Sequence, residues 1–206
     1  MRPALVSLGA ATGIVSGVTL AQRLGAVSLG PFAATPRAIG DGRVGLLAAS
    51  ALVADRPAVP SIAGFALVGV AALLLAVPRK LWTAAVAGHL LATLAVYGVL
   101  HELAYPVTQA DYGTSAIIAA WIGVVACVLW RRGRRAAGVV LCVVSALVGW
   151  YFRPDLNVLD TEHLVALALG IAIAAPRPPL RVPAAVKVLV PRPLLRRGLL
   201  RLSRSA

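Results

Sequence analysis

Residues 81–103 read LWTAAVAGHLLATLAVYGVLHEL, a run of 23 residues with no lysine or arginine and one acid, Glu102, next to its end. An α-helix rises about 1.5 Å per residue, so a helix of this length reaches across the roughly 30 Å hydrocarbon core of a bilayer. The run lacks the apolar–polar alternation of a barrel strand. The sequence therefore predicts a transmembrane helix here.

Five further runs are long and apolar enough to be spans, some of them barely: Ala4–Leu20, Ser61–Val77, Tyr112–Trp130, Ala136–Phe152 and Leu159–Ala175. Hydrophobic residues make up 60% of the 206 residues and charged residues 13%, whereas soluble domains are roughly 45–50% apolar. Mean hydropathy is +0.88. We therefore expect an all-α, polytopic membrane protein with six transmembrane helices in residues 1–175.

Two other regions complete the predicted organisation. Residues 21–60 form an outer loop, in which the apolar stretch Val44–Ala54 is too short to cross and is expected to be re-entrant or interfacial. Residues 176–206 form a tail with six prolines, eight basic residues and no acid. Within the tail, Leu194–Leu202 mixes leucine and arginine and could lie on anionic lipid. The alternative is a solvated tail without a specific partner.

The charges predict an orientation. The net charge is +13, and six crossings with both termini in the cytoplasm place 15 of the 20 Lys and Arg residues on the inner side and all seven acids on the outer side. This distribution follows the positive-inside rule for a multi-pass protein of the inner (plasma) membrane. Aromatic residues are only 5% of the chain and do not interleave with the basic clusters, so no nucleic-acid partner is expected.

The first apolar run resembles a signal peptide in having Arg2 before it. We instead expect a retained helix, because Gly9, Gly13 and Gly17 fall four residues apart. That spacing places a flat glycine face on one side of the helix, suited to close packing against another helix.

Polar residues gather at the outer ends of the fourth and sixth predicted spans. The fourth begins Asp111-Tyr112-Gly113-Thr114-Ser115-Ala116, and the sixth begins Asp160-Thr161-Glu162-His163. Both spans run from outside to inside. Ser115 then lies about 6 Å below Asp111, and His163 about 4.5 Å below Asp160, so the two side chains share nearly the same depth.

A serine at the depth of a histidine suggests nucleophilic catalysis. A neutral imidazole can take the hydroxyl proton and make serine a nucleophile. Gly113 would let a substrate backbone approach Ser115, whose own N–H, near a helix N-terminus, could hold a developing oxyanion. The alternative is a purely structural role for both residues: Ser115 would hydrogen-bond to a carbonyl of its own helix, and His163 would lie at the membrane interface.

The other candidate residues carry weaker signals. His89 is eight residues into the third span, roughly 10 Å or more from the depth of Ser115, so we expect packing and hydrogen bonding beside Thr93. His101 and Glu102 favour an interfacial pair, and His89, His101 and Asp111 could each have a supporting role at the site. Cys127 and Cys142 lie in apolar runs as small hydrophobic residues. No metal ion or cofactor is expected, because no ligand motif is present.

The six-helix plan resembles the rhomboid family of intramembrane serine proteases. That family has Gly-x-Ser at the start of helix four, as in Gly113-Thr114-Ser115, and a histidine on helix six followed by small residues, as in His163, Ala166 and Gly170. A divergent bacterial rhomboid-like branch is closer still, with matches at Gly88-His89, Ala92-Thr93-Leu94 and Asp111. The resemblance covers roughly residues 4–175. It implies a Ser115–His163 dyad that hydrolyses peptide bonds of transmembrane protein substrates.

The sequence also departs from the rhomboid pattern. Ala116 and Ala119 stand where active rhomboids usually have a glycine and often an aromatic residue, and Pro78-Arg79-Lys80 replaces a Glu-and-Gly turn. Ser61–Val77 has neither the histidine nor the asparagine that serves the oxyanion in the family. The alternative function is therefore a weakly active or inactive rhomboid-like protein that binds transmembrane helices. A small transporter is a third hypothesis, although buried charges for an ion path are nearly absent.

Overall fold

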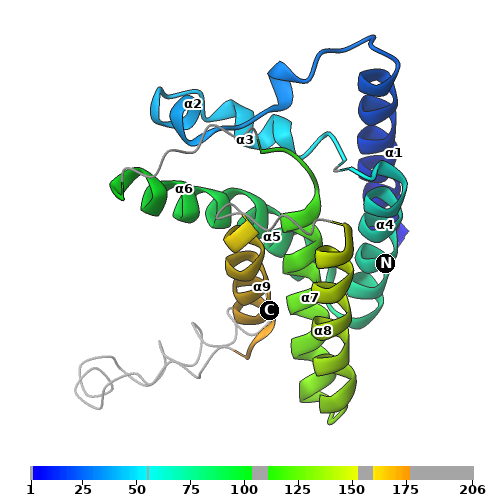
Figure 1. Ribbon diagram of the computed structural model, residues 1–206. Helices are drawn as coiled ribbons and strands as arrows, with labels where there is room; N and C mark the ends of the chain where they lie inside the picture. Colours follow the sequence, from blue (N-terminus) through cyan, green and yellow to red (C-terminus); the bar gives the residue numbers. More distant parts are fainter. Residues whose placement is uncertain (1, 55, 104–110, 153–159, 177–206) are drawn as a thin grey trace, which may run out of the picture. The chain divides into compact units, whose positions relative to one another are not determined.

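The computed structural model describes residues 2–54, 56–103, 111–152 and 160–176 (Figure 1). The chain divides into two units, Met1–Ala175 and Pro176–Ala206. Almost all of the second unit, including the predicted lipid-binding stretch Leu194–Leu202, lies outside the described residues.

Every element of the described chain is helical, as predicted, and the only strand-like feature there is one β-bridge between Ala34 and Asp111. The elements are α1 (Arg2–Arg23), η1 (Gly30–Phe32), α2 (Pro36–Gly40), α3 (Gly45–Ser50), α4 (Ala58–Leu75), α5 (Pro78–Val86), η2 (Ala87–Leu91), α6 (Ala92–Glu102), α7 (Ser115–Arg131), α8 (Arg135–Phe152) and α9 (Thr161–Ala174).

Within the described residues, three stretches are long and apolar enough to cross a membrane: α1, α4 and the continuous helix Pro78–Glu102, which comprises α5, η2 and α6. Helices α7, α8 and α9 are also apolar but shorter over the residues described. The segment η2, which holds Gly88 and His89, is a π-helical turn inside the long helix. Such turns widen a helix locally and are frequent at functional sites.

Helix α7 is the centre of the bundle and packs against α4, α5, α8 and α9. Figure 1 shows α8 alongside it. Its Trp121 is fully buried, donates a hydrogen bond from Nε1 to Leu81 O at 2.9 Å, and lies 4.8 Å from the Phe65 ring. These contacts fix α7 against both α4 and α5.

Helices α7 and α9 approach so closely that their backbones touch. A Cβ atom on Gly123 would collide with Leu167 O, and one on Gly170 would collide with Ala120 O. Gly88 of η2 lies equally tightly against the Cβ of Ala120. Small residues therefore form the predicted seam, which brings the start of α7 next to the start of α9.

The predicted role of the α1 glycines is wrong for the described chain. No atom lies within 4 Å of the Cβ position of Gly9, Gly13 or Gly17. Instead, α1 packs against α4 through other positions, and Leu8 lies on Gly69. Burying leucine removes more apolar area from water or lipid headgroups than burying glycine, and Gly69 provides the space on the partner helix.

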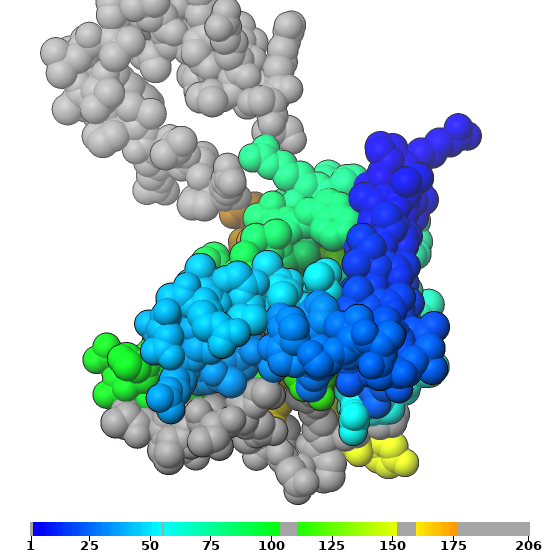
Figure 2. All heavy atoms as spheres, turned by 90° about the horizontal axis from the view of Figure 1, so that it is seen from above, coloured from blue at the N-terminus to red at the C-terminus, as the bar shows by residue number. Residues whose placement is uncertain are grey.

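The segment between α1 and α4 spreads over one face of the Met1–Ala175 unit (Figure 2). Within it, the apolar stretch Val44–Ala54 contains only the six-residue helix α3, which agrees with a segment too short to cross. Ala54 N donates to Thr19 Oγ1 at 2.8 Å, and Ala34 and Asp111 exchange backbone hydrogen bonds at 2.8 Å. The segment is thereby fixed to α1 and to the residues that lead into α7.

Basic side chains gather at the C-terminal ends of α4 and α9. Lys80 and Arg131 donate to Ala174 O, at 3.0 and 3.5 Å, and Arg132 donates to Leu75 O at 3.2 Å. These carbonyls belong to the C-terminal ends of α9 and α4, where cations are favoured by the helix dipole.

Candidate functional site

Ser115 is the first residue of α7 and is partly exposed. The turn that leads to it is fixed by Gly113, whose φ of +137° favours glycine and whose N–H donates to Ser50 O at 3.0 Å. Gly113 is itself buried. The observed role of Gly113 is therefore to form the turn before α7.

His163 lies in the first turn of α9 with one ring nitrogen held and the other free. Its Nδ1 lies 3.1 Å from Asp160 O and 3.8 Å from Asp160 Oδ1. A carbonyl oxygen only accepts, so Nδ1 carries the proton in this contact. Nε2 is buried and has no hydrogen-bond partner among the described residues. In a neutral ring with this tautomer, Nε2 is the basic nitrogen.

Direct packing of α7 on α9 brings the regions of Ser115 and His163 together. Ala116 O and the Cβ of Ala166 lie 3.2 and 3.6 Å from the Cβ position of Gly88, so the first turn of α7 and the second turn of α9 meet at Gly88. No hydrogen bond joins Ser115 to His163 in the described structure. Catalytic hydrogen bonds are often long without substrate and shorten in the reactive complex.

His89 is linked to the turn before Ser115 through contacts with α3. Its Nε2 lies 2.7 Å from Leu47 O and 3.1 Å from Ser50 Oγ, and Ser50 O accepts from Gly113. The intervening helix α3 connects His89 to the turn before Ser115, which a count along one helix does not reveal.

Ser50 and His89 form a serine–histidine contact that does not suit catalysis. Because Leu47 O can only accept, His89 Nε2 must carry a proton and cannot take one from Ser50. Ser50 is only 2% exposed, and its hydroxyl donates to Leu47 O at 3.0 Å. This pair therefore anchors α3 to η2.

A buried carboxylate lies next to His163 and was not identified from the sequence. Glu162 is 4% exposed, and its Oε2 accepts a hydrogen bond from Thr93 Oγ1 at 2.9 Å. Thr93 Oγ1 also lies 2.5 Å from His89 O. The contact joins α6 to the first turn of α9 and restrains the rotation of α9 about its axis.

The remaining predicted residues occupy two different settings. Asp111 accepts a hydrogen bond from Tyr97 OH at 3.2 Å and forms the β-bridge with Ala34. It therefore holds the segment between α1 and α4 in place. His101 and Glu102 are exposed in the last turn of α6. In the described structure they make no hydrogen bond to Ser115 or His163.

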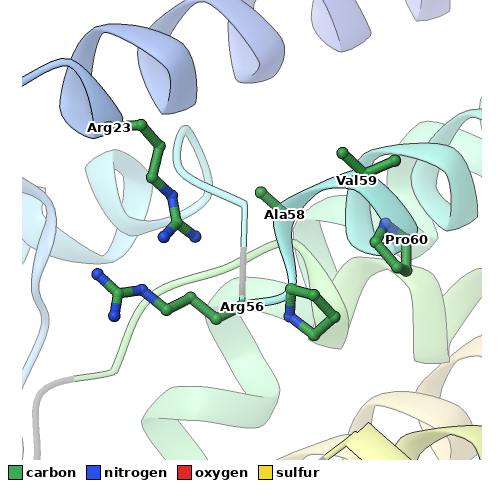
Figure 3. A pocket seen from close by; sticks show the side chains of 6 residues that line it. Arg23, Arg56, Ala58, Val59 and Pro60 are labelled. Atoms are coloured by element: carbon green, nitrogen blue, oxygen red, sulfur yellow. The ribbon is translucent and has the colours of Figure 1, made fainter.

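A hollow of about 540 Å³ lies elsewhere, between the ends of α1 and α4 (Figure 3). Arg23 and Arg56 border it, together with Pro57, Val59 and Pro60. Neither Ser115 nor His163 lines it, so it does not form part of the candidate site.

Comparison of the chain with known protein families, curated proteins and solved structures found no match.

Proposed function

We propose that this protein is a rhomboid-like intramembrane serine protease in which Ser115 and His163 form the catalytic dyad. The observation that carries the proposal is the state of His163. Its Nδ1 is held by Asp160 O while its buried Nε2 has no partner among the described residues. A base for Ser115 requires this arrangement, on a helix in direct contact with α7.

The reaction follows from these positions. His163 Nε2 takes the proton from Ser115 Oγ as that oxygen bonds to the scissile carbonyl carbon, and the carbonyl oxygen takes up the negative charge. The C–N bond then breaks, and His163 returns the proton to the leaving amine. Water hydrolyses the resulting ester by the same proton transfers, which restores Ser115.

The proposed membrane arrangement has six crossings, formed by α1, α4, Pro78–Glu102, α7, α8 and α9, with both termini in the cytoplasm. The C-terminal ends of α4, α7 and α9, where Lys80, Arg131 and Arg132 lie, would face the cytoplasm under the positive-inside rule. Ser115 and His163 then lie near the outer surface, where the substrate is a transmembrane protein. Anionic lipid remains the proposed partner of the basic tail.

A non-catalytic rhomboid-like protein that binds transmembrane helices is the second candidate. The favouring observation is that α4 reads AVPSIAGFALVGVAALLL, with Ser61 as its only polar side chain. An oxyanion donor is worth about 10²–10³ in rate, so a site without donors from α4 must find them elsewhere or remain inactive.

Labelling with a fluorophosphonate, which reacts with activated serines, separates the two candidates. We expect the purified full-length protein to be labelled, and expect Ser115→Ala and His163→Ala to abolish labelling. Ser145→Ala, a serine within α8, is the matched control and should be labelled like the wild type. Labelling that survives Ser115→Ala, or a wild type that is never labelled, would exclude the protease and leave the helix-binding protein.

A further inference from the structure

Thr114 occupies the N-cap position of α7 and does not cap the helix. A threonine at this position ordinarily accepts a hydrogen bond from a backbone N–H in the first turn. The Thr114 side chain makes no such bond, although its carbonyl oxygen accepts from Ile118 N at 3.0 Å. The hydroxyl is thus not used by the helix it precedes.

The same hydroxyl is buried without a partner. Thr114 is 0% exposed, and its Oγ1 has no hydrogen-bond partner in the described part of the chain. A buried hydroxyl without a partner is unfavourable, and native structures rarely keep one without a use. The Gly113 N–H to Ser50 O bond holds the preceding turn in place.

The proposed reaction needs a donor at this place. Negative charge develops on the carbonyl oxygen beside Ser115, where the first-turn N–H groups of α7 and the helix dipole favour an anion. Helix α4 supplies no side-chain donor beyond Ser61, at its outer end. His89 is also unsuited, because its proton is on Nε2 and its unpartnered Nδ1 can only accept.

We propose that the Thr114 hydroxyl is the side-chain donor to the oxyanion, acting with the backbone N–H of Ser115. The inference rests on the proposed protease function and names the group that replaces the missing donors of α4. Without substrate, the Thr114 hydroxyl has no hydrogen-bond partner among the described residues. When Ser115 Oγ bonds to the carbonyl carbon, the Thr114 O–H donates to the resulting oxyanion and releases it when the carbonyl re-forms.

The test compares Thr114→Val with Thr114→Ser, because valine keeps the shape of threonine without its hydroxyl and serine keeps the hydroxyl. We expect Thr114→Val to lower the fluorophosphonate labelling rate, and kcat on a reconstituted transmembrane peptide, by about 10²–10³ with little change in KM. Thr114→Ser should stay within a few-fold of the wild type. Thr12→Val on α1, whose hydroxyl bonds to Leu8 O of its own helix, is the control and should not change either rate.

A second measurement separates a chemical role from a structural one. Removing an unpaired buried hydroxyl should leave the unfolding midpoint of Thr114→Val equal to or above that of the wild type, whereas a structural hydroxyl would lower it. If the valine variant does not fold, Thr114→Ala replaces it and is compared with Thr114→Ser, from which it differs by one hydroxyl.

The outcomes distinguish this inference from the function on which it rests. A wild type labelled at Ser115 together with an equally fast Thr114→Val overturns the role of Thr114 and leaves the protease proposal intact. A wild type that is not labelled at Ser115 removes both. Slow labelling by Thr114→Val with rescue by serine supports both.

Discussion

The imidazole of His89 shows how one buried side chain can hold two distant segments together. It is 6% exposed and binds Leu47 O and Ser50 from its place in η2. These contacts join the segment between α1 and α4 to the long helix Pro78–Glu102. Loss of the imidazole would leave a buried carbonyl and hydroxyl with fewer partners, which is costly away from water.

We predict that His89→Leu lowers the free energy of unfolding by about 1–3 kcal/mol, because it removes one of the two side-chain donors to Leu47 O and the contact with Ser50. The midpoint of unfolding in detergent measures the effect. His101→Leu is the matched control, since His101 is exposed in α6, and it should have little effect. Equal stability of the two variants would contradict a structural role for His89.

The sequence indicated some residues of the site and not others for a physical reason. Ser115 and His163 stand out because polar residues are costly in apolar runs and their depths can be counted. Ser50 is a common polar residue whose contact with His89 depends on a partner far along the chain, and the contact of Thr93 with Glu162 does so as well. Glu162 resembled an ordinary acid at a membrane surface, and only the position of Thr93 shows that it is buried.

At the scale of elements, the α7–α9 seam depends on the absence of side chains. A methyl group on Gly170 would collide with Ala120 O, a backbone atom that cannot rotate away. The two helices would have to separate, and with them the first turns that carry Ser115 and His163.

We predict that Gly170→Ala destabilises the protein by about 1–3 kcal/mol through overpacking and reduces labelling of Ser115. Gly98→Ala on α6 is the control, because no atom lies within 4 Å of its Cβ position. Unfolding midpoints and labelling rates of the two variants should therefore diverge. A Gly170→Ala protein as stable and reactive as Gly98→Ala would show that the helices can separate at no cost.

The helices themselves were largely predictable, since each predicted span overlaps an observed helix with ends shifted by a few residues. Hydropathy is a property of a segment and can be read from the sequence alone. In contrast, the side of a helix that contacts a neighbouring helix depends on the sequences of both helices. The glycine spacing on α1 predicted the wrong side because the small residue of that pair, Gly69, is on α4.

At the scale of the whole molecule, two sets of contacts mark different ends of the Met1–Ala175 unit: basic residues bind the ends of α4 and α9, and the segment between α1 and α4 binds the start of α7. In the proposed topology, the end with the basic residues faces the cytoplasm.

We predict that single cysteines placed at the two ends react from opposite sides of the membrane. In a Cys127→Ala, Cys142→Ala background, Ser28→Cys should react with an impermeant maleimide in intact cells. Val77→Cys should react only after the membrane is opened. Both positions are exposed and neither substitution removes a charge. The reverse pattern would invert the proposed topology and place Ser115 on the cytoplasmic side.

The backbone contact between α7 and α9 also limits how a polypeptide can travel to the hydroxyl of Ser115. At Gly123 and Gly170 the two helices leave no room for even one methyl group, so this side of the bundle is a closed wall to a chain diffusing within the lipid. In the proposed protease, a substrate would therefore have to approach Ser115 around another side of α7 or from the aqueous phase. The contact that aligns the two helices would thereby also set the route of the substrate.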